Sequence, residues 1–132
     1  MVLPNLFVNI RNRINCMATK EEIAWLAGVL EGEACFDLNR GDPRYPRMRI
    51  EMTDRDVLVR IKQILGNLET KEGGIRARKT KKIHHTPTHA FQIAAIDQVK
   101  QLFAAILPWM SARRSKQIVK LMKEAGWVLV ES

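Results

Sequence analysis

The chain has 132 residues, of which 46% are apolar and 27% charged, a composition typical of one globular domain with its own core. Its 22 Lys and Arg against 14 Asp and Glu give a net charge of +8, which indicates a polyanionic partner: nucleic acid or an anionic membrane surface, with an inert basic surface as the alternative. The chain has only two cysteines, which excludes a disulfide scaffold, and their spacing fits no zinc motif. No apolar run is long enough to cross a bilayer, which excludes a membrane-spanning protein. We therefore expect an intracellular protein with no membrane partner, from a bacterial or phage cytoplasm or from an organelle.

Residues 1–18 are predicted to form a basic N-terminal arm, and residues 19–132 a single domain. The arm carries Arg11 and Arg13 and no acid. A transit peptide is the alternative, but Pro4 and two asparagines interrupt an amphipathic or signal-like pattern.

A first helix is predicted to begin at a capping box, residues 19–22, where Thr19 is the N-cap and a glutamate follows three residues later. The helix stays apolar to its last turn and ends on two acids, Glu31 and Glu33, with Gly32 between them. Acids at the C-terminal end of a helix are electrostatically unfavourable, so we expect a compensating group, such as a metal ion.

Two short strands are expected next, over residues 36–40 and 47–52, joined by turn residues. The second alternates strictly between charged and apolar residues, which is typical of a strand with one buried face. Cys35 lies at the start of the first strand and is expected to be a small buried hydrophobe.

A second helix, capped by Thr53 or Asp54, is predicted to stop at Gly66. Strands over 75–83 and 90–95 follow, and Ile75 and Ala77 are expected on the inner face of the first of these.

Two more helices complete the chain. The first is predicted to be capped by Asp97 and ended by Pro108, and the second to span residues 112–125. Trp109 and Trp127 flank this last helix and are expected to be core anchors. The element order predicts an α+β fold in which helices cover one face of a four-stranded antiparallel sheet.

The other face of that sheet would be strongly basic. Residues 71–82 alone hold six basic side chains and one acid, a local net charge of +5. Arg can pair with guanine edges, Gln with adenine edges, and Lys neutralises phosphates, so we favour DNA binding over a merely solvated face. The predicted DNA contacts, on the strands and their connecting loops, are Asp37, Asn39, Arg40, Arg44, Arg47, Arg49, Glu51, Arg76, Arg78, Thr80, Lys82 and Gln92.

Three histidines, His84, His85 and His89, flank a turn and suggest a metal site. Because no carboxylate or thiolate stands at ligand spacing, we favour a hairpin tip that contacts phosphate or water.

Residues 26–34, Leu-Ala-Gly-Val-Leu-Glu-Gly-Glu-Ala, resemble the nine-residue signature of the LAGLIDADG homing endonucleases. Ala34 replaces the usual final glycine, and Glu33 stands where aspartate is common. The element order over about 19–125 resembles the family as well. The resemblance implies the αββαββαα homing-endonuclease fold and a sequence-specific endonuclease that hydrolyses phosphodiester bonds in double-stranded DNA.

With one motif per chain, the resemblance implies a homodimer on a long pseudo-palindromic site, with the signature helices packed at the two-fold axis. Ala27 and Gly28 carry little bulk, which would allow close helix approach. The predicted dimer interface comprises Trp25, Ala27, Gly28 and Leu30.

The resemblance also implies Mg²⁺-dependent hydrolysis, with Glu33 as the catalytic metal ligand and the Gly32 carbonyl as a second ligand. Glu31 and Asp54 would lie around the metal site. The supporting basic catalytic residue of the family falls by position at Arg113, or else at Lys116. A non-cleaving DNA-binding protein, an RNA-splicing maturase of the same fold and an unrelated α+β interaction domain are the alternatives.

Overall fold

The computed structural model describes residues 18–66, 74–78 and 86–127. The elements follow the predicted order: α2 (Lys20–Glu33), β1 (Ala34–Leu38), β2 (Pro46–Met52), α3 (Arg55–Leu65), β3 (Arg76–Arg78), β4 (Thr88–Ile93), α4 (Ile96–Ile106), the 3₁₀ helix η1 (Leu107–Trp109) and α5 (Ala112–Glu124). The N-terminal arm up to residue 17 and the predicted sites Thr80, Lys82, His84 and His85 lie outside the described residues.

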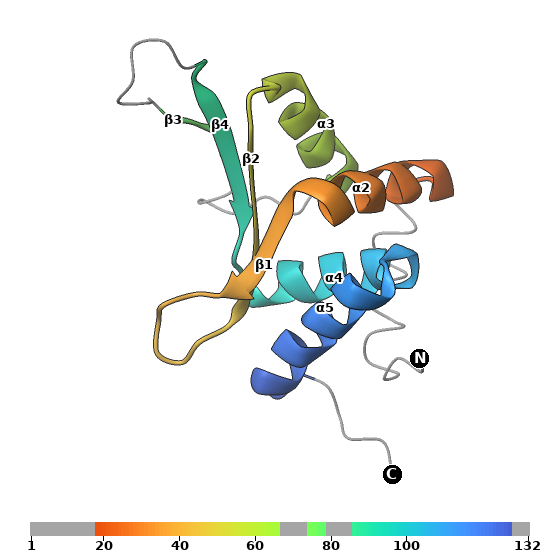
Figure 1. Cartoon of the computed structure of the whole chain (residues 1–132), viewed down its shortest axis with the longest axis vertical. Helices are drawn as coiled ribbons and strands as arrows, with labels where there is room; N and C mark the ends of the chain where they lie inside the picture. The colour runs from red at the N-terminus through yellow and green to blue at the C-terminus, as the bar shows by residue number, and fades with distance from the viewer. Residues whose placement is uncertain (1–17, 67–73, 79–85, 128–132) are drawn as a thin grey trace.

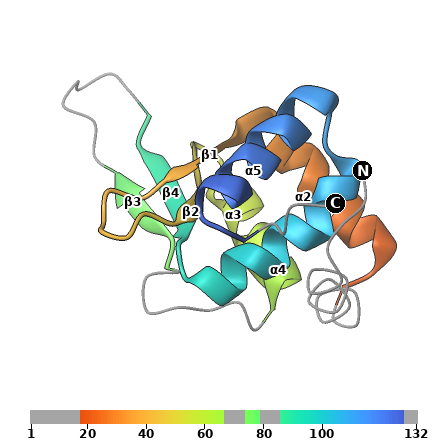
Figure 2. The same ribbon diagram turned by 90° about the horizontal axis from the view of Figure 1, so that it is seen from below.

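The four strands form one antiparallel sheet in the order β1-β2-β4-β3. Helices α2 to α5 lie on one side of the sheet, and none of the described elements covers the opposite face (Figure 1 and Figure 2). The predicted α+β architecture is therefore confirmed. Among the described residues, no helix is both long and apolar enough to cross a membrane.

The core lies between the sheet and the helices because each strand alternates as predicted. Met48 and Ile50 of β2 are buried, while Arg49 between them is exposed on the uncovered face. Phe36 of β1 packs edge-on against Phe103 of α4, with 5.7 Å between ring centroids. The predicted capping box at Thr19 is present and begins α2.

The junction between α2 and β1 differs from the prediction. No linker separates them, because β1 begins at Ala34, directly after the last residue of α2. Strand alternation then turns Ala34 and Phe36 inward, so Cys35 is exposed on the uncovered face. The prediction that Cys35 is buried is wrong.

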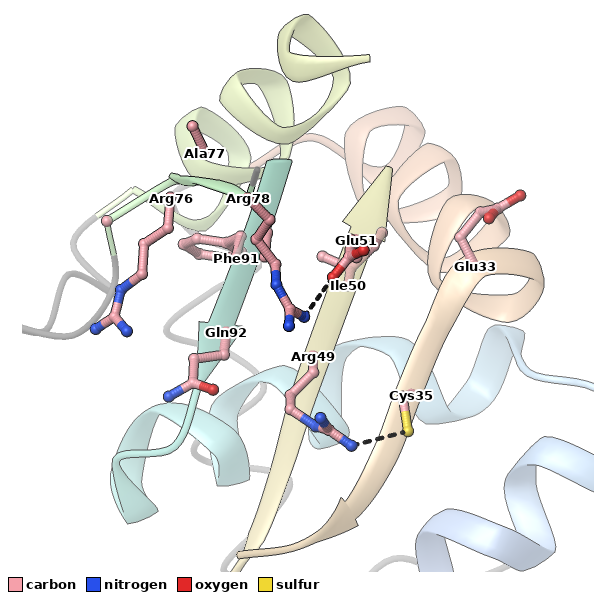
Figure 3. Close-up of a pocket in the computed structure, with 12 residues that line it drawn as sticks. Glu33, Cys35, Arg49, Ile50, Glu51, Arg76, Ala77, Arg78, Phe91 and Gln92 are labelled. Carbon is pink, nitrogen blue, oxygen red and sulfur yellow. Dashed lines mark hydrogen bonds and ion pairs between the residues drawn. The ribbon is translucent and has the colours of Figure 1, made fainter. Parts of the chain in front are cut away.

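Several other expectations also need correction. Ala77 points to the side of β3 opposite Arg76 and Arg78, as expected, but it is exposed because β3 is an edge strand of the sheet (Figure 3). The N-cap of α4 is Ala95, and Asp97 lies in the first turn instead. Trp109 is 44% exposed and is no core anchor, whereas Trp127, at 8%, is buried as predicted.

Candidate active site and nucleic-acid interface

A groove of about 540 Å³ lies over the uncovered face of the sheet. Arg49 of β2, Gln92 of β4, and Arg76 and Arg78 of β3 project from the strands into this groove (Figure 3). Glu51 lines the same groove, so five of the predicted DNA contacts are brought together on one concave surface. Glu33, the last residue of α2, lines the same groove at its rim.

Glu33 is exposed at the point where α2 ends and β1 begins. Within the described part of the chain, no hydrogen bond or ion pair engages its carboxylate. Glu33 lies at the edge of the arginine-lined groove, and its carboxylate points away from Arg49 and Arg78 (Figure 3). An exposed carboxylate without a protein partner is available to a cation or to water. Its neighbour Gly32 is also exposed, and a Cβ added there would meet no atom within 4 Å.

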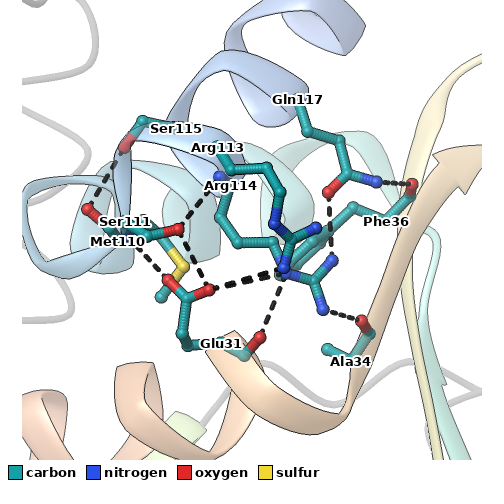
Figure 4. Close-up of polar contacts among 9 residues, drawn as sticks. All are labelled: Glu31, Ala34, Phe36, Met110, Ser111, Arg113, Arg114, Ser115 and Gln117. Atoms are coloured by element: carbon teal, nitrogen blue, oxygen red, sulfur yellow. Dashed lines mark hydrogen bonds and ion pairs between the residues drawn. The ribbon is translucent and has the colours of Figure 1, made fainter.

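Glu31, two residues earlier, has a different environment. Its carboxylate accepts hydrogen bonds from the backbone N–H of Ser111 at 2.6 Å and from the Ser111 hydroxyl at 3.1 Å. Arg114 and Arg113 lie 3.7 and 4.0 Å from it (Figure 4). The Ser111 hydrogen bonds, with the two arginines, lower the pKa of Glu31. Glu31 therefore caps the N-terminus of α5, and protein groups, not a metal, compensate this acid.

Asp37 of β1 holds two arginines of β2. Its carboxylate accepts from Arg47 Nε at 2.8 Å and from Arg49 Nη2 at 2.5 Å. Burial raises the pKa of Asp37, but the two arginines outweigh it and lower the pKa overall. The hydrogen bond that Arg49 donates to Asp37 also raises the pKa of Arg49, whose guanidinium reaches Cys35 Sγ at 3.6 Å as well.

Glu51 of β2 makes a similar pair with β3 and β4. It accepts a hydrogen bond from the Thr88 hydroxyl at 3.0 Å and forms an ion pair with Arg78 at 2.6 Å, and both interactions lower its pKa. Asp37 and Glu51, both predicted as DNA contacts, are thus occupied with arginines of the same face. An acid in this position sets the direction of an arginine fork, which a phosphate or base can then meet.

The remaining predicted DNA contacts lie in the β1–β2 loop. Arg40 and Arg44 are exposed there. Asn39 closes the loop, because its Oδ1 and its backbone N–H both bond to Tyr45.

The predicted supporting residues are not gathered in the groove. Asp54 is exposed at the N-cap of α3, and Arg113 and Lys116 are exposed on the first turns of α5; none of the three lines the groove with Glu33. Arg114, which the sequence analysis passed over, is instead buried beneath the end of α2. It stands four residues before the buried Ile118, on the inward stripe of α5, and this helical spacing was a readable signal.

Two of the four predicted interface residues are corrected by the structure. Ala27 and Leu30 are 1% and 0% exposed because they face the core of their own chain. The exposed side of α2 instead presents Gly28 and Gly32, one helical turn apart, with half-buried Trp25 beside them. The guanidinium of Arg60 from α3 lies 4.0 Å above the Trp25 ring.

The sheet order and helical layer define the class of fold, which is that of the homing endonucleases. Among solved structures, the chain is similar to the homing endonuclease I-CvuI in complex with the I-CreI target and 2 mM Mg, in which the DNA is not cleaved. The TM-score is 0.58 at 17% identity, over 82% of this chain and 68% of that one.

An archaeal intron-encoded homing endonuclease, I-Vdi141I in complex with DNA, also gives a TM-score of 0.58 at 17% identity, over 80% of this chain and 68% of that chain. I-CvuI with its target in 2 mM Ca gives 0.55 at 18% identity, over 80% and 66%. The predicted resemblance is thus confirmed at the level of the fold. Neither a scan against protein-family models nor a search of curated proteins finds a match.

Proposed function

We propose that the protein is a homing endonuclease that hydrolyses phosphodiester bonds in a long, pseudo-palindromic site of double-stranded DNA as a homodimer. One observation carries the proposal. The exposed carboxylate of Glu33 stands, without a described partner, at the rim of the groove that Arg49, Arg76 and Arg78 line. A DNA backbone in such a groove would contact the guanidinium groups along the groove and the carboxylate of Glu33 at its edge.

The basic face supports DNA as the substrate. The chain carries a net charge of +8, and the groove places arginine forks and the amide of Gln92 on one surface. Arginine pairs with guanine edges and glutamine with adenine edges, while both arginine and lysine neutralise phosphates. The similar structures of I-CvuI and I-Vdi141I are complexes with DNA, which agrees with this assignment.

Glu33 and the Gly32 carbonyl would hold a divalent cation such as Mg²⁺. The donor set fits, because both groups offer oxygen ligands and Mg²⁺ keeps several waters when few protein ligands are present. Within the described residues, no group of three or more His, Cys, Asp or Glu side chains gathers to hold a metal, so one chain contributes few ligands. When bound, the cation would supply charge neutralisation at the phosphate and a more acidic water.

The exposed side of α2 supports the homodimer. Gly28 and Gly32 leave its backbone uncovered, and a Cβ at either position would meet no atom within 4 Å. A second copy of α2 could therefore pack closely against this side. Such packing would bring the two Glu33 carboxylates toward one DNA molecule, so that each copy completes the site of the other.

The test is cleavage of a plasmid library in Mg²⁺ by the wild type and by Glu33→Gln, with binding measured in parallel. We expect wild-type cutting to be lost in Glu33→Gln while DNA binding persists. Glu124→Gln, which removes a carboxylate at the far end of α5, is the matched control and should cut normally. Equal cutting by the wild type and Glu33→Gln would overturn the catalytic role of Glu33.

The same assay, with binding to a structured RNA measured beside binding to DNA, separates the alternatives. Tight, salt-sensitive binding without cutting by the wild type would indicate a non-cleaving DNA-binding protein. Preference for a structured RNA over DNA would indicate an RNA-splicing maturase.

A further inference from the structure

Arg114 of α5 is the only charged side chain among the described residues that is buried, at 9% exposed. Its guanidinium donates from Nε to the carbonyl of Glu31 at 3.1 Å and from Nη2 to the carbonyl of Ala34 at 2.7 Å. Nη1 donates to Gln117 Oε1 at 3.0 Å (Figure 4). The planar group also lies 5.3 Å from the centre of the Phe36 ring.

These hydrogen bonds hold the end of α2, which carries the candidate metal ligands. Gly32 and Glu33 lie in sequence between the two carbonyls that Arg114 holds, so both ends of the short segment are tied to one rigid group. Gln117 extends the grip, because its Nε2 donates to the carbonyl of Phe36 at 3.1 Å. Helix α5 therefore fixes both where α2 ends and how β1 leaves it.

The charge of Arg114 is suited to this place. The last carbonyls of a helix carry a partial negative charge, and a buried cation there stabilises them. Only arginine offers several donors in one planar fork, so a single side chain can reach two carbonyls and an amide oxygen together.

We infer that Arg114 is a positioning residue for Glu33: it holds the helix end so that the Glu33 carboxylate and the Gly32 carbonyl meet the cation in one geometry. This inference rests on the proposed endonuclease function. Arg114 does not line the groove that holds Glu33, so its effect reaches the metal through the backbone. A residue that orients metal ligands typically changes metal affinity or activity by about 10- to 100-fold when removed.

The test compares Arg114→Met and Arg114→Lys with Lys120→Met, a matched loss of charge at an exposed position of the same helix. Three quantities are measured: Mn²⁺ binding to the protein–DNA complex by electron paramagnetic resonance of the free ion, DNA affinity without metal, and the Mg²⁺ concentration for half-maximal cleavage. For Arg114→Met we expect about 10- to 100-fold weaker Mn²⁺ binding and a parallel rise in the Mg²⁺ requirement. DNA affinity should stay within about twofold of the wild type, since phosphate contacts on the sheet are untouched.

Arg114→Lys should fall between the wild type and Arg114→Met, because an ammonium retains the charge but not the fork. If Arg114→Met fails to fold, Gln117→Leu removes the hydrogen bonds of Gln117 to Arg114 and to the carbonyl of Phe36. It should raise the Mg²⁺ requirement as well, but by less.

Wild-type metal binding and cleavage in the Arg114 variants, with only a lower melting temperature, would overturn the inference and leave the endonuclease function standing. A wild-type protein that neither binds Mn²⁺ on DNA nor cuts would overturn both.

Discussion

A leucine at position 28 should have opposite effects on the single chain and on the homodimer. Gly28 is an exposed helical residue, and a Cβ there would meet no atom of its own chain within 4 Å. Glycine costs a helix about 0.8–1.0 kcal/mol relative to alanine, and leucine is nearly as favourable as alanine. Gly28→Leu should therefore stabilise each protomer by about 0.8 kcal/mol, which corresponds to a rise in melting temperature of about 3 °C.

In the proposed homodimer, the exposed sides of two α2 helices, which carry Gly28 and Gly32, would form a close seam across the two-fold axis. The leucine would appear there twice, where glycine leaves no room for a large side chain. Overpacking a close contact costs roughly 1–3 kcal/mol for each side chain, or about 2–6 kcal/mol per dimer. Since about 1.4 kcal/mol is a tenfold change in an equilibrium constant, the dimer should dissociate about 30-fold more readily at the least.

Sedimentation velocity over a concentration series measures the dissociation constant of the dimer. Thermal unfolding of the dilute protein measures the melting temperature of the protomer. Lys120→Leu, on the exposed side of α5, controls for an added surface leucine. Ala27→Leu provides the contrast, because Ala27 is 1% exposed and a larger side chain there should strain the protomer's own core. A Gly28→Leu protein that dimerises as tightly as the wild type would refute the placement of the seam on this side of α2, as would a wild type that stays monomeric on DNA.

Two further predictions concern the uncovered face and the core. The pKa of Asp37 is lowered in the folded protein, where its carboxylate pairs with Arg47 and Arg49. These ion pairs therefore stabilise the fold fully above about pH 4, the usual pKa of an aspartate. The stabilisation is lost as the pH falls through the lowered pKa of the folded state. The gap in melting temperature between wild type and Asp37→Asn should thus be constant above about pH 5 and close below about pH 4; a gap that persists at low pH would contradict this. Trp127→Ala should cost about 3–5 kcal/mol in urea unfolding, because Trp127 is 8% exposed and packs on Phe103; a loss below about 1 kcal/mol would show that the ring is dispensable.

The elements and the sheet could be predicted because their signals are local. The capping box at Thr19 starts α2, and the strict alternation of β2 places Met48 inside and Arg49 outside. Cys35 was misplaced for a local reason too: with Phe36 inside, its neighbour had to face out once the strand was continuous with α2.

The site was harder to predict because it depends on which elements meet. Nothing near Glu31 in the sequence indicates that Ser111, eighty residues later, would donate two hydrogen bonds to its carboxylate. Helical spacing predicts that Ala27 faces the core and Gly28 faces outward, since Ala27 shares the buried stripe of Leu30 and Gly28 does not. Arg114 was passed over because a charged residue is expected at the surface, and only its tertiary contacts with two carbonyls show why it is buried.

The spacing of the two acids explains how one helix end can serve two purposes. Residues two apart on an α-helix point about 200° away from each other, so Glu31 and Glu33 cannot face the same partner. Glu31 turns toward α5, where Ser111 and Arg114 neutralise it, and Glu33 is exposed at the edge of the groove. Anchoring the first acid fixes the direction of the second, and Gly32 between them adds no side chain that could cover the groove. A single-residue insertion between the acids would rotate Glu33 by about 100° and remove its carboxylate from the groove even if the fold persisted.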